Sequence, residues 1–392
     1  MARDLVTGDG SSSRLVIPLR YSPMRVPETP ATVARDAANR PGADFAQIYF
    51  PAQGATPVGQ AYSAQTTSDP WQRPSRYPPL EHRIFSATLS RLPYGWGCLV
   101  HLAAQVLLML ASLLLALSAL GLLRKHWLPT LLLFDACLFL TPVGLSCLER
   151  GQFSLYVGLA YLLLLLALLT GRWRYALLCA LFAFVKWTAL PFVAVALAVA
   201  LALSRDTREA RQRLGFAAAF AATFALLTFC LPADALTFVE GLVRQEAEMV
   251  PTGNSLTKLL PRFAVKALPA ALVIGGSFWR LSGPRPLAFQ IPFFAAAGTV
   301  LATYPTSSFD YSTPYLVAFV PLLAHWADLP GIGPRLGRIT VWGFAAFLLL
   351  ASFARAAFGT SESIVIGSYA VAAALLACAP LLARRGQDGA SA

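Results

Sequence analysis

The chain has few charged residues and few residues of the kinds that bind metals or form disulfides. Only 13% of its 392 residues are charged, compared with about 25% in an ordinary soluble domain. Its six cysteines lie in or at the ends of apolar runs without a CxxC spacing, so neither a disulfide framework nor a zinc site is supported. His101, His126 and His325 lie near the ends of predicted helices without a second ligand at metal spacing, and we interpret them as structural. No metal and no cofactor is therefore expected.

Several motifs of soluble enzymes are also absent. The sequence contains no HExxH, GxSxG or Rossmann fingerprint. The stretch 253–258, Gly-Asn-Ser-Leu-Thr-Lys, has the composition of a phosphate-binding loop but lacks the GxxxxGKS or GxxxxGKT spacing and a preceding strand, which excludes a P-loop. No apolar segment of the secretory type follows Met1, so a cleavable signal peptide is not predicted.

Long apolar runs make up most of the chain instead, and 57% of all residues are hydrophobic. A helix needs about 20 apolar residues to cross the hydrocarbon layer of a membrane. We therefore predict an all-α polytopic membrane protein with about 10–11 transmembrane helices. The runs cover residues 98–123, 128–147, 153–170, 175–203, 214–231, 264–283, 287–304, 313–327, 339–357 and 364–382, and each except 175–203 is predicted to be a single helix.

The formal net charge of +12 comes from basic residues that stand in small groups at the ends of these runs. They form no single patch, so the predicted partner is the lipid bilayer and not nucleic acid. The positive-inside rule places the acidic linkers outside and predicts a multi-pass protein of the cell (inner) membrane. It makes these basic linkers cytoplasmic: 124–125, 172–174, 205–213, 280–285, 335–338 and 384–385.

The run 175–203 is flanked by basic groups at both ends, so it is predicted to turn back instead of crossing once. Its centre holds Lys186, with Pro191 five residues later, where two short helices can break around a buried charge. An ammonium group in an apolar run is costly unless it is paired or hydrated. A ligand phosphate would pair with Lys186, and so would a structural carboxylate such as Asp135.

Four regions follow from this topology. Residues 1–35 are predicted to be disordered, 36–97 to form an extracytoplasmic catalytic loop, 98–383 to form the transmembrane helical bundle, and 384–392 to form a cytoplasmic tail. The spacing of apolar residues after Asp44 predicts a short amphipathic helix on the membrane surface. Asp44, at the start of that helix, is either its N-cap or a general base that takes a proton from a hydroxyl group.

Basic and polar residues near the membrane boundary are further candidates. Arg73, Arg76 and His82 surround the turn Tyr77-Pro78-Pro79-Leu80, and the arginines either contact lipid headgroups or bind the phosphate of a lipid-linked donor. The same phosphate role is predicted for Lys186, Lys258 and Arg262. The other residues expected to line the site are Tyr77, His82, Glu149, Gln152, Asn254, Asp310 and Tyr311.

Five short motifs occur in order along the chain: Ala43-Asp44-Phe45 followed by Tyr49, the Tyr77 turn, Gly151-Gln152, Lys186 before Pro191, and Gly253-Asn254-Ser255-Leu256. Together they resemble glycosyltransferase family 87, from about residue 42 to about residue 325. The resemblance implies a polytopic C-type transferase that uses a polyprenyl-phosphate sugar and inverts the anomeric centre, with Asp44 as the base. A mannose-like or other hexose would pass to a glycan or glycolipid acceptor on the extracytoplasmic face.

The sequence departs from the family pattern in two places. The family has a transmembrane helix ahead of the catalytic loop; here either that helix is lacking or the gene starts upstream of Met1. The family often has a late-loop histidine where this chain has Asp310 and Tyr311, and these two either substitute for the histidine or do not replace its interaction. The alternative functions are a lipid-linked-sugar transporter or flippase and an inactive lipid-binding relative. A transporter typically has broken helices in corresponding places of two halves, and the sequence indicates one break and no internal repeat.

Overall fold

A computed structural model of the chain describes residues 42–53, 58–63, 66–69, 73–248, 252–253, 255–278, 287–305, 307–308, 312–358 and 362–388. In these residues nearly every element is a helix, which confirms the predicted all-α class of a polytopic membrane protein. Two strands of two residues each, β1 (Thr252–Gly253) and β2 (Ser307–Ser308), pair in parallel.

The α-helices alternate with short connections that contain single turns of 3₁₀-helix. The α-helices are α2 (Ala43–Gln53), α3 (Pro79–Ala87), α4 (Tyr94–Ala119), α5 (Leu123–Phe139), α6 (Pro142–Glu149), α7 (Leu155–Thr170), α8 (Trp173–Val185), α9 (Leu190–Ala202), α10 (Thr207–Phe229), α11 (Pro232–Glu248), α12 (Arg262–Ser277), α13 (Ile291–Leu301), α14 (Ser312–Leu316), α15 (Val320–Ala327), α16 (Pro334–Phe358) and α17 (Glu362–Asp388). The 3₁₀ turns are η2 (Val58–Tyr62), η3 (Leu89–Arg91), η4 (Trp187–Ala189), η5 (Leu256–Lys258), η7 (Leu287–Gln290) and η8 (Val317–Phe319).

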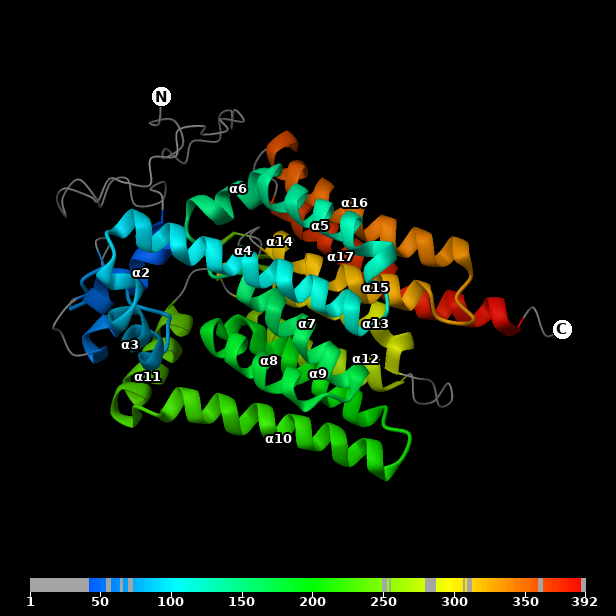
Figure 1. Ribbon diagram of the computed structural model, residues 1–392, viewed down its shortest axis with the longest axis horizontal. Coiled ribbons are helices and arrows are strands. Elements are labelled where there is room, and N and C mark those ends of the chain that lie inside the picture. The colour runs from blue at the N-terminus through cyan, green and yellow to red at the C-terminus, as the bar shows by residue number, and fades with distance from the viewer. Residues whose placement is uncertain are drawn as a thin grey trace.

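The helices form a bundle with two distinct ends. Figure 1 shows the long helices running side by side, with α2, α3 and α11 gathered at the left of the view. We call this the Asp44 end. At the opposite end, Gln212 of α10 donates a hydrogen bond to the Gly171 carbonyl at 3.2 Å, and Arg213 donates to the Ala200 carbonyl. We call this the Arg213 end.

The segment from α8 to α9 turns back at the Asp44 end. The start of α8 follows Gly171 and the end of α9 contains Ala200, so both lie at the Arg213 end. Lys186, between the two helices, has its Nζ 5.2 Å from the centroid of the Tyr77 ring, which belongs to the Asp44 end. Its backbone is extended, with φ −137° and ψ 94°, and Pro191 follows in the first turn of α9. The predicted break and reversal at Lys186 are confirmed.

Full-length crossing helices are fewer than the sequence predicts. Within the described residues, three helices are long and apolar enough to cross a membrane: Tyr94–Ala119, Thr207–Phe229 and Pro334–Ala351. The other apolar runs form shorter apolar helices of 10–17 residues or a bent pair. The prediction of about 10–11 crossings counted apolar runs of the sequence. In the structure, several of these runs form short helices and not one long helix each.

The run 128–147 is one place where the prediction of a single helix is wrong. It forms α5 and α6, whose axes differ by 69°. Thr141 lies between them with φ −105° and ψ 147°, and its hydroxyl accepts a hydrogen bond from the Gly144 amide at 3.0 Å as the N-cap of α6. A residue that precedes a proline avoids the helical conformation, and Pro142 follows Thr141. The bend brings the end of α6 to the Asp44 end.

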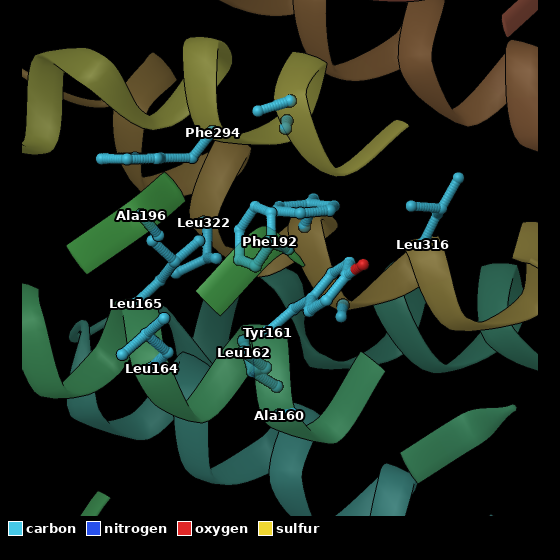
Figure 2. Close-up of a cluster of buried hydrophobic side chains, with 14 of the residues drawn as sticks. Ala160, Tyr161, Leu162, Leu164, Leu165, Phe192, Ala196, Phe294, Leu316 and Leu322 are labelled. Carbon is cyan, nitrogen blue, oxygen red and sulfur yellow. The ribbon is translucent and has the colours of Figure 1, made fainter. Parts of the chain in front are cut away.

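Helix α7 is the centre of the main hydrophobic core. Nearly all of its side chains are buried on every face, as expected for a helix without a polar stripe. Figure 2 shows Tyr161 of α7 beside Phe192 of α9, and their ring centroids are 4.0 Å apart. Leu316 of α14 and Leu322 of α15 lie in the same cluster. This packing fixes the position of α7, whose N-terminal neighbours belong to the Asp44 end.

Helix α2 occupies the segment in which a short amphipathic helix is predicted, but it is buried on more than one face. Phe45, Ala46, Ile48 and Tyr49 are each at most 2% exposed. The helix packs against α3 and η3, and the Phe45 and Tyr94 ring centroids lie 5.7 Å apart. Burial on adjacent positions shows that α2 is part of a folded unit at the Asp44 end and does not present a single apolar face.

Candidate active site

The Asp44 carboxylate is held by three side chains from distant parts of the sequence. Arg150 donates from Nε to Oδ2 at 2.8 Å and from Nη2 to Oδ1 at 3.1 Å. Gln152 Nε2 donates to Oδ2, and Arg73 Nη1 lies 3.4 Å from Oδ1. A bidentate arginine fixes the orientation of a carboxylate as well as its charge. The Asp44 side chain is 14% exposed, so the group is partly buried and still accessible.

Two glycines allow the segments around Asp44 and Arg150 to meet. Gly42 has φ +74° and Gly151 has φ +62°, a conformation that costs other residues energy. A Cβ atom on Gly151 would lie 3.3 Å from the Gly42 Cα. The Asp44 amide donates to the Arg150 carbonyl at 2.8 Å, and the Gly42 amide donates to the Glu149 carbonyl at 2.6 Å. These bonds satisfy amide groups at the start of α2 that have no partner within the helix.

Arg73 is oriented by a second acid. Asp69 is 2% exposed, and its carboxylate accepts from Arg73 Nε and Nη2, each at 3.0 Å. The Arg73 amide also donates to Asp69 at 3.0 Å. Arg73 therefore bridges Asp69 and Asp44, which makes it a ligand of the Asp44 carboxylate in this structure.

Lys186 lies over a pair of aromatic rings. Its Nζ is 5.2 Å from the Tyr77 ring centroid and 6.0 Å from that of Phe153, and these rings are 4.5 Å apart. Such cation–π contacts contribute about 0.5–2 kcal/mol, increasing with desolvation. The carboxyl groups whose charges act on Lys186 are Asp44 and Glu81. Asp135, the structural partner considered from the sequence, is not among these groups in the described part of the chain.

The long helix α4 supports the segment that carries Gln152. Gln105 Nε2 donates to the Gln152 carbonyl at 2.7 Å and lies 2.8 Å from His101 Nε2. The His101 ring packs against Phe153, with centroids 4.1 Å apart. Gln152 contacts Asp44, and the ring of Phe153 lies under Lys186. Both residues are thus anchored to α4.

His82 supports the turn before α3. Its Nε2 lies 2.8 Å from the Ser75 hydroxyl, and that hydroxyl accepts from the Tyr77 amide at 3.3 Å. Burial lowers the pKa of His82 to about 3, so the ring is neutral at pH 7. Arg76 points elsewhere: its Nε donates to Gln245 of α11 at 3.3 Å, and its side chain is exposed.

The folded end of the bundle therefore combines a clamped carboxylate and a lysine on aromatic rings, which are linked through residues 150–153, with an exposed arginine, Arg76. The model of glycosyltransferase family 87 matches residues 76–305, which is more than half of the chain. The chain belongs to glycosyltransferase family 87. No curated protein and no solved structure matches the chain. As a family 87 member, it is a membrane glycosyltransferase.

The family match includes Arg76, the 149–153 segment and Lys186, but it begins after Asp44. The proposed base therefore rests on the contacts of Asp44 and not on the match. Glu149 contributes its carbonyl to the Gly42 amide.

Other predicted site residues lie beside these or outside the described residues. Arg262 Nη1 donates to the Ala247 carbonyl at 3.3 Å and ties α12 to α11, and Lys258 in η5 is exposed. The Leu256 amide donates to the Thr303 carbonyl at 2.9 Å, which connects η5 to the end of α13. Asn254, Asp310 and Tyr311 lie outside the described residues.

The structure adds two residues that the sequence prediction did not include in the site. Arg150 forms the bidentate pair with Asp44. The sequence feature that could have identified it is its place in a short polar segment, Glu149–Gln152, between two apolar runs. Glu81 is buried in α3, one helical turn before Phe85, whose ring packs on Phe153. The sequence feature that could have identified Glu81 is its position directly after two prolines and a leucine.

Proposed function

We propose that this family 87 protein transfers a hexose, mannose-like or another, from a polyprenyl-phosphate-sugar donor to a glycan or glycolipid acceptor. Asp44 acts as the base, and Lys186 binds the donor phosphate. The observation that supports this most is the connection between the two groups. Gln152 contacts the Asp44 carboxylate, and the ring of the next residue, Phe153, lies under Lys186. The proposed base and the proposed phosphate ligand therefore lie at the same end of the bundle.

The reaction is a displacement at the anomeric carbon. The acceptor oxygen attacks this carbon, the bond from carbon to the phosphate oxygen breaks, and polyprenyl phosphate leaves with the bonding electrons. The acceptor proton passes to Asp44. Attack from the face opposite the phosphate inverts the anomeric configuration. Lys186 stabilises the negative charge that develops on the leaving phosphate.

The arginines have different roles in this proposal. Arg150 and Arg73 orient the Asp44 carboxylate, and the longer contact, at 3.4 Å to Arg73, opens as the acceptor hydroxyl arrives. Arg76 is exposed at the same end and is proposed as a further phosphate ligand. Lys258 and Arg262 are proposed as ligands of the same phosphate or of its neighbouring lipid headgroups.

We further propose that the Asp44 end faces the extracytoplasmic side of the cell (inner) membrane. The Arg213 end carries a cluster of basic residues, which supports a cytoplasmic location by the positive-inside rule. The cluster comprises Arg172, Arg174, Arg205, Arg208, Arg211 and Arg213. A donor presented on the outer face would then meet Asp44 and Lys186 without entering the cytoplasm.

The test is transfer by the full chain in lipid nanodiscs. Radiolabelled polyprenyl-phosphate mannose and polyprenyl-phosphate glucose are each offered with membrane glycolipid acceptors. Asp44→Asn keeps the shape of the side chain but removes the base, so kcat should fall by about 10²–10⁴-fold. Lys186→Ala should weaken donor binding and raise the KM for donor. Equal transfer by wild type and Asp44→Asn would remove Asp44 from the mechanism.

Matched controls separate these effects from general loss of structure. Asp328→Asn removes a carboxylate that pairs with Lys125 at 2.9 Å, on a side chain that is 39% exposed. Lys266→Ala removes an exposed lysine of α12. Both controls should transfer at the wild-type rate, because exposed charges contribute little to stability. Donor binding unchanged in Lys186→Ala would refute the phosphate assignment.

A further inference from the structure

Glu81 carries a buried carboxyl group at the start of α3. Its side chain lies in the first turn of α3, and the residue is 3% exposed. In the described part of the chain, neither carboxyl oxygen has a hydrogen-bond partner. A buried polar group in this state is costly unless something pairs with it. The carboxyl is therefore poised to respond to a nearby charge.

The sequence explains why Glu81 lacks the usual partner for its position. An acid three residues after an N-cap often accepts a hydrogen bond from the N-cap amide, in the capping box. Here the N-cap is Pro78, which has no amide hydrogen, and Pro79 follows it. The carboxyl group is consequently free to interact outside its own helix.

Helical spacing places Glu81 on the same side of α3 as Phe85. Glu81 and Phe85 are four residues apart within α3, which places them on one side of the helix, and Tyr77 lies just before the N-cap Pro78. The rings of Tyr77 and Phe85 both pack on Phe153, with centroids 4.5 Å and 6.0 Å apart. Lys186 lies over two rings of this group, those of Tyr77 and Phe153. Glu81 therefore lies one helical turn from a ring of the aromatic cluster over which the Lys186 ammonium lies.

Lys186 is the cation whose charge acts on Glu81. Burial raises the pKa of Glu81 well above its usual range, and the ammonium of Lys186 opposes this rise. The charged residues of α10 lie at the Arg213 end. The other elements around α3 carry further titratable or charged groups, which include Asp44 and Tyr49 of α2, Tyr62 of η2, Arg91 of η3, Tyr94 and His101 of α4, Tyr156 and Tyr161 of α7, and Asp234, Glu240, Arg244 and Glu246 of α11.

We propose that Glu81 is a positioning residue that competes with the donor phosphate for Lys186. When its carboxyl is protonated, the ammonium is available to the phosphate. When the carboxyl is ionised, it attracts the ammonium and repels the phosphate. This inference rests on the proposed phosphate role of Lys186, and it adds a control on donor binding that the transfer reaction itself does not require.

The sign of the pH effect follows from linkage. A bound phosphate favours the neutral form of Glu81, so donor binding promotes proton uptake by this group. By reciprocity, raising the pH weakens donor binding. The donor is a phosphodiester, whose single acidic oxygen is ionised throughout the neutral range, so the donor does not titrate there. Deprotonation of Lys186 at high pH would also weaken donor binding, but that effect would persist in Glu81→Gln. A pH dependence of donor affinity that Glu81→Gln removes is therefore assigned to Glu81.

The experiment measures equilibrium binding of radiolabelled polyprenyl-phosphate mannose to the full chain in nanodiscs. The pH is varied from about 6 to about 9.5, because buried glutamates can titrate near pH 8–9. In wild type, Kd should rise by about tenfold across this range, within the span of typical coupling between two sites. In Glu81→Gln, which has the shape of the protonated acid, Kd should stay constant at the low-pH value.

The matched control is Glu240→Gln, the same change at an exposed position of α11. It should retain the wild-type pH dependence. A constant wild-type Kd, or a pH dependence that persists in Glu81→Gln, would overturn the proposal. If Glu81→Gln does not fold, Glu81→Met, which fills a similar volume without a charged or protonatable group, takes its place and should also give a constant Kd.

The binding assay also separates this inference from the proposed function. Binding that changes with pH as predicted, without sugar transfer to any acceptor, would support the role of Glu81 and refute the transferase mechanism. Transfer that depends on Asp44, together with a donor Kd that does not change with pH, would support the transferase mechanism and refute the role of Glu81. Absence of donor binding at every pH would refute both.

Discussion

Replacing Gly151 by alanine tests the geometry that brings Asp44 and Arg150 together. Gly151 has φ +62°, and an added Cβ atom would lie 2.9 Å from the Phe45 Cβ and 3.3 Å from the Gly42 Cα. The positive φ costs alanine about 1–2 kcal/mol. The contact with Phe45 and Gly42 involves a buried side chain and backbone, and overpacking of this kind costs about 1–3 kcal/mol more. We expect Gly151→Ala to destabilise the protein by about 2–5 kcal/mol.

Gly121→Ala separates the two contributions. Gly121 has nearly the same φ, +73°, but an added Cβ atom would meet nothing within 4 Å. It should therefore cost only the backbone contribution of about 1–2 kcal/mol. Thermal unfolding of both variants in the same nanodiscs measures the difference, which should be about 1–3 kcal/mol.

The activity of the same variants tests the functional part of the reasoning. A shift of about 1 Å in a positioned catalytic group can cost about 10²-fold in rate. Gly151→Ala should lower kcat because the Asp44 carboxylate moves relative to Arg150 and Gln152, whereas Gly121→Ala should not change kcat. Equal stability losses in the two variants would refute the steric argument. An unchanged kcat in a folded Gly151→Ala protein would refute the role of this close approach in catalysis.

Two further predictions concern the ligands of the site. Arg150→Lys keeps the positive charge but loses the bidentate pair with Asp44. We expect it to lower kcat at least as much as Arg73→Lys, because Arg73 makes a longer contact with Asp44. A smaller fall of kcat in Arg150→Lys than in Arg73→Lys would contradict this order. Tyr94→Phe removes the hydroxyl that donates a hydrogen bond to the buried Gly42 carbonyl at 2.7 Å. The free energy of unfolding should fall by about 1–3 kcal/mol. Thr88→Val removes an exposed hydroxyl that bonds to its own helix, and it should lower the free energy of unfolding by less.

The sequence predicted those features that depend on local chemistry. A lysine inside an apolar run, between two basic linkers, indicated the reversal at Lys186 because neither the charge nor the topology suits a single crossing. The bend at Thr141 also had a local signal, since a residue before proline leaves the helical conformation, although the apolar run concealed it. Hydrophobicity indicates which segments lie in the membrane or the core, but it does not indicate where a helix within such a segment ends.

Contacts between distant segments could not be predicted in this way. Arg150 and Asp44 are 106 residues apart in the chain, and their contact depends on two glycines at positive φ. Glu81 looked like an ordinary first-turn acid. Its role depends on the missing amide of Pro78 and on the rings of Tyr77 and Phe153, which separate parts of the chain bring together.

The shortness of α8 and α9 has a consequence for how a lipid reaches Lys186. Each helix has 13 residues, so each rises about 20 Å, against a hydrocarbon layer about 30 Å thick. With the Arg213 end at one surface of the bilayer, the turn between them stops about 10 Å below the other surface. A lipid phosphate that pairs with Lys186 has to sink between the helices and leave most of its hydration water behind. In the proposed mechanism, the depth of Lys186 therefore favours donors whose phosphate is carried on a lipid anchor.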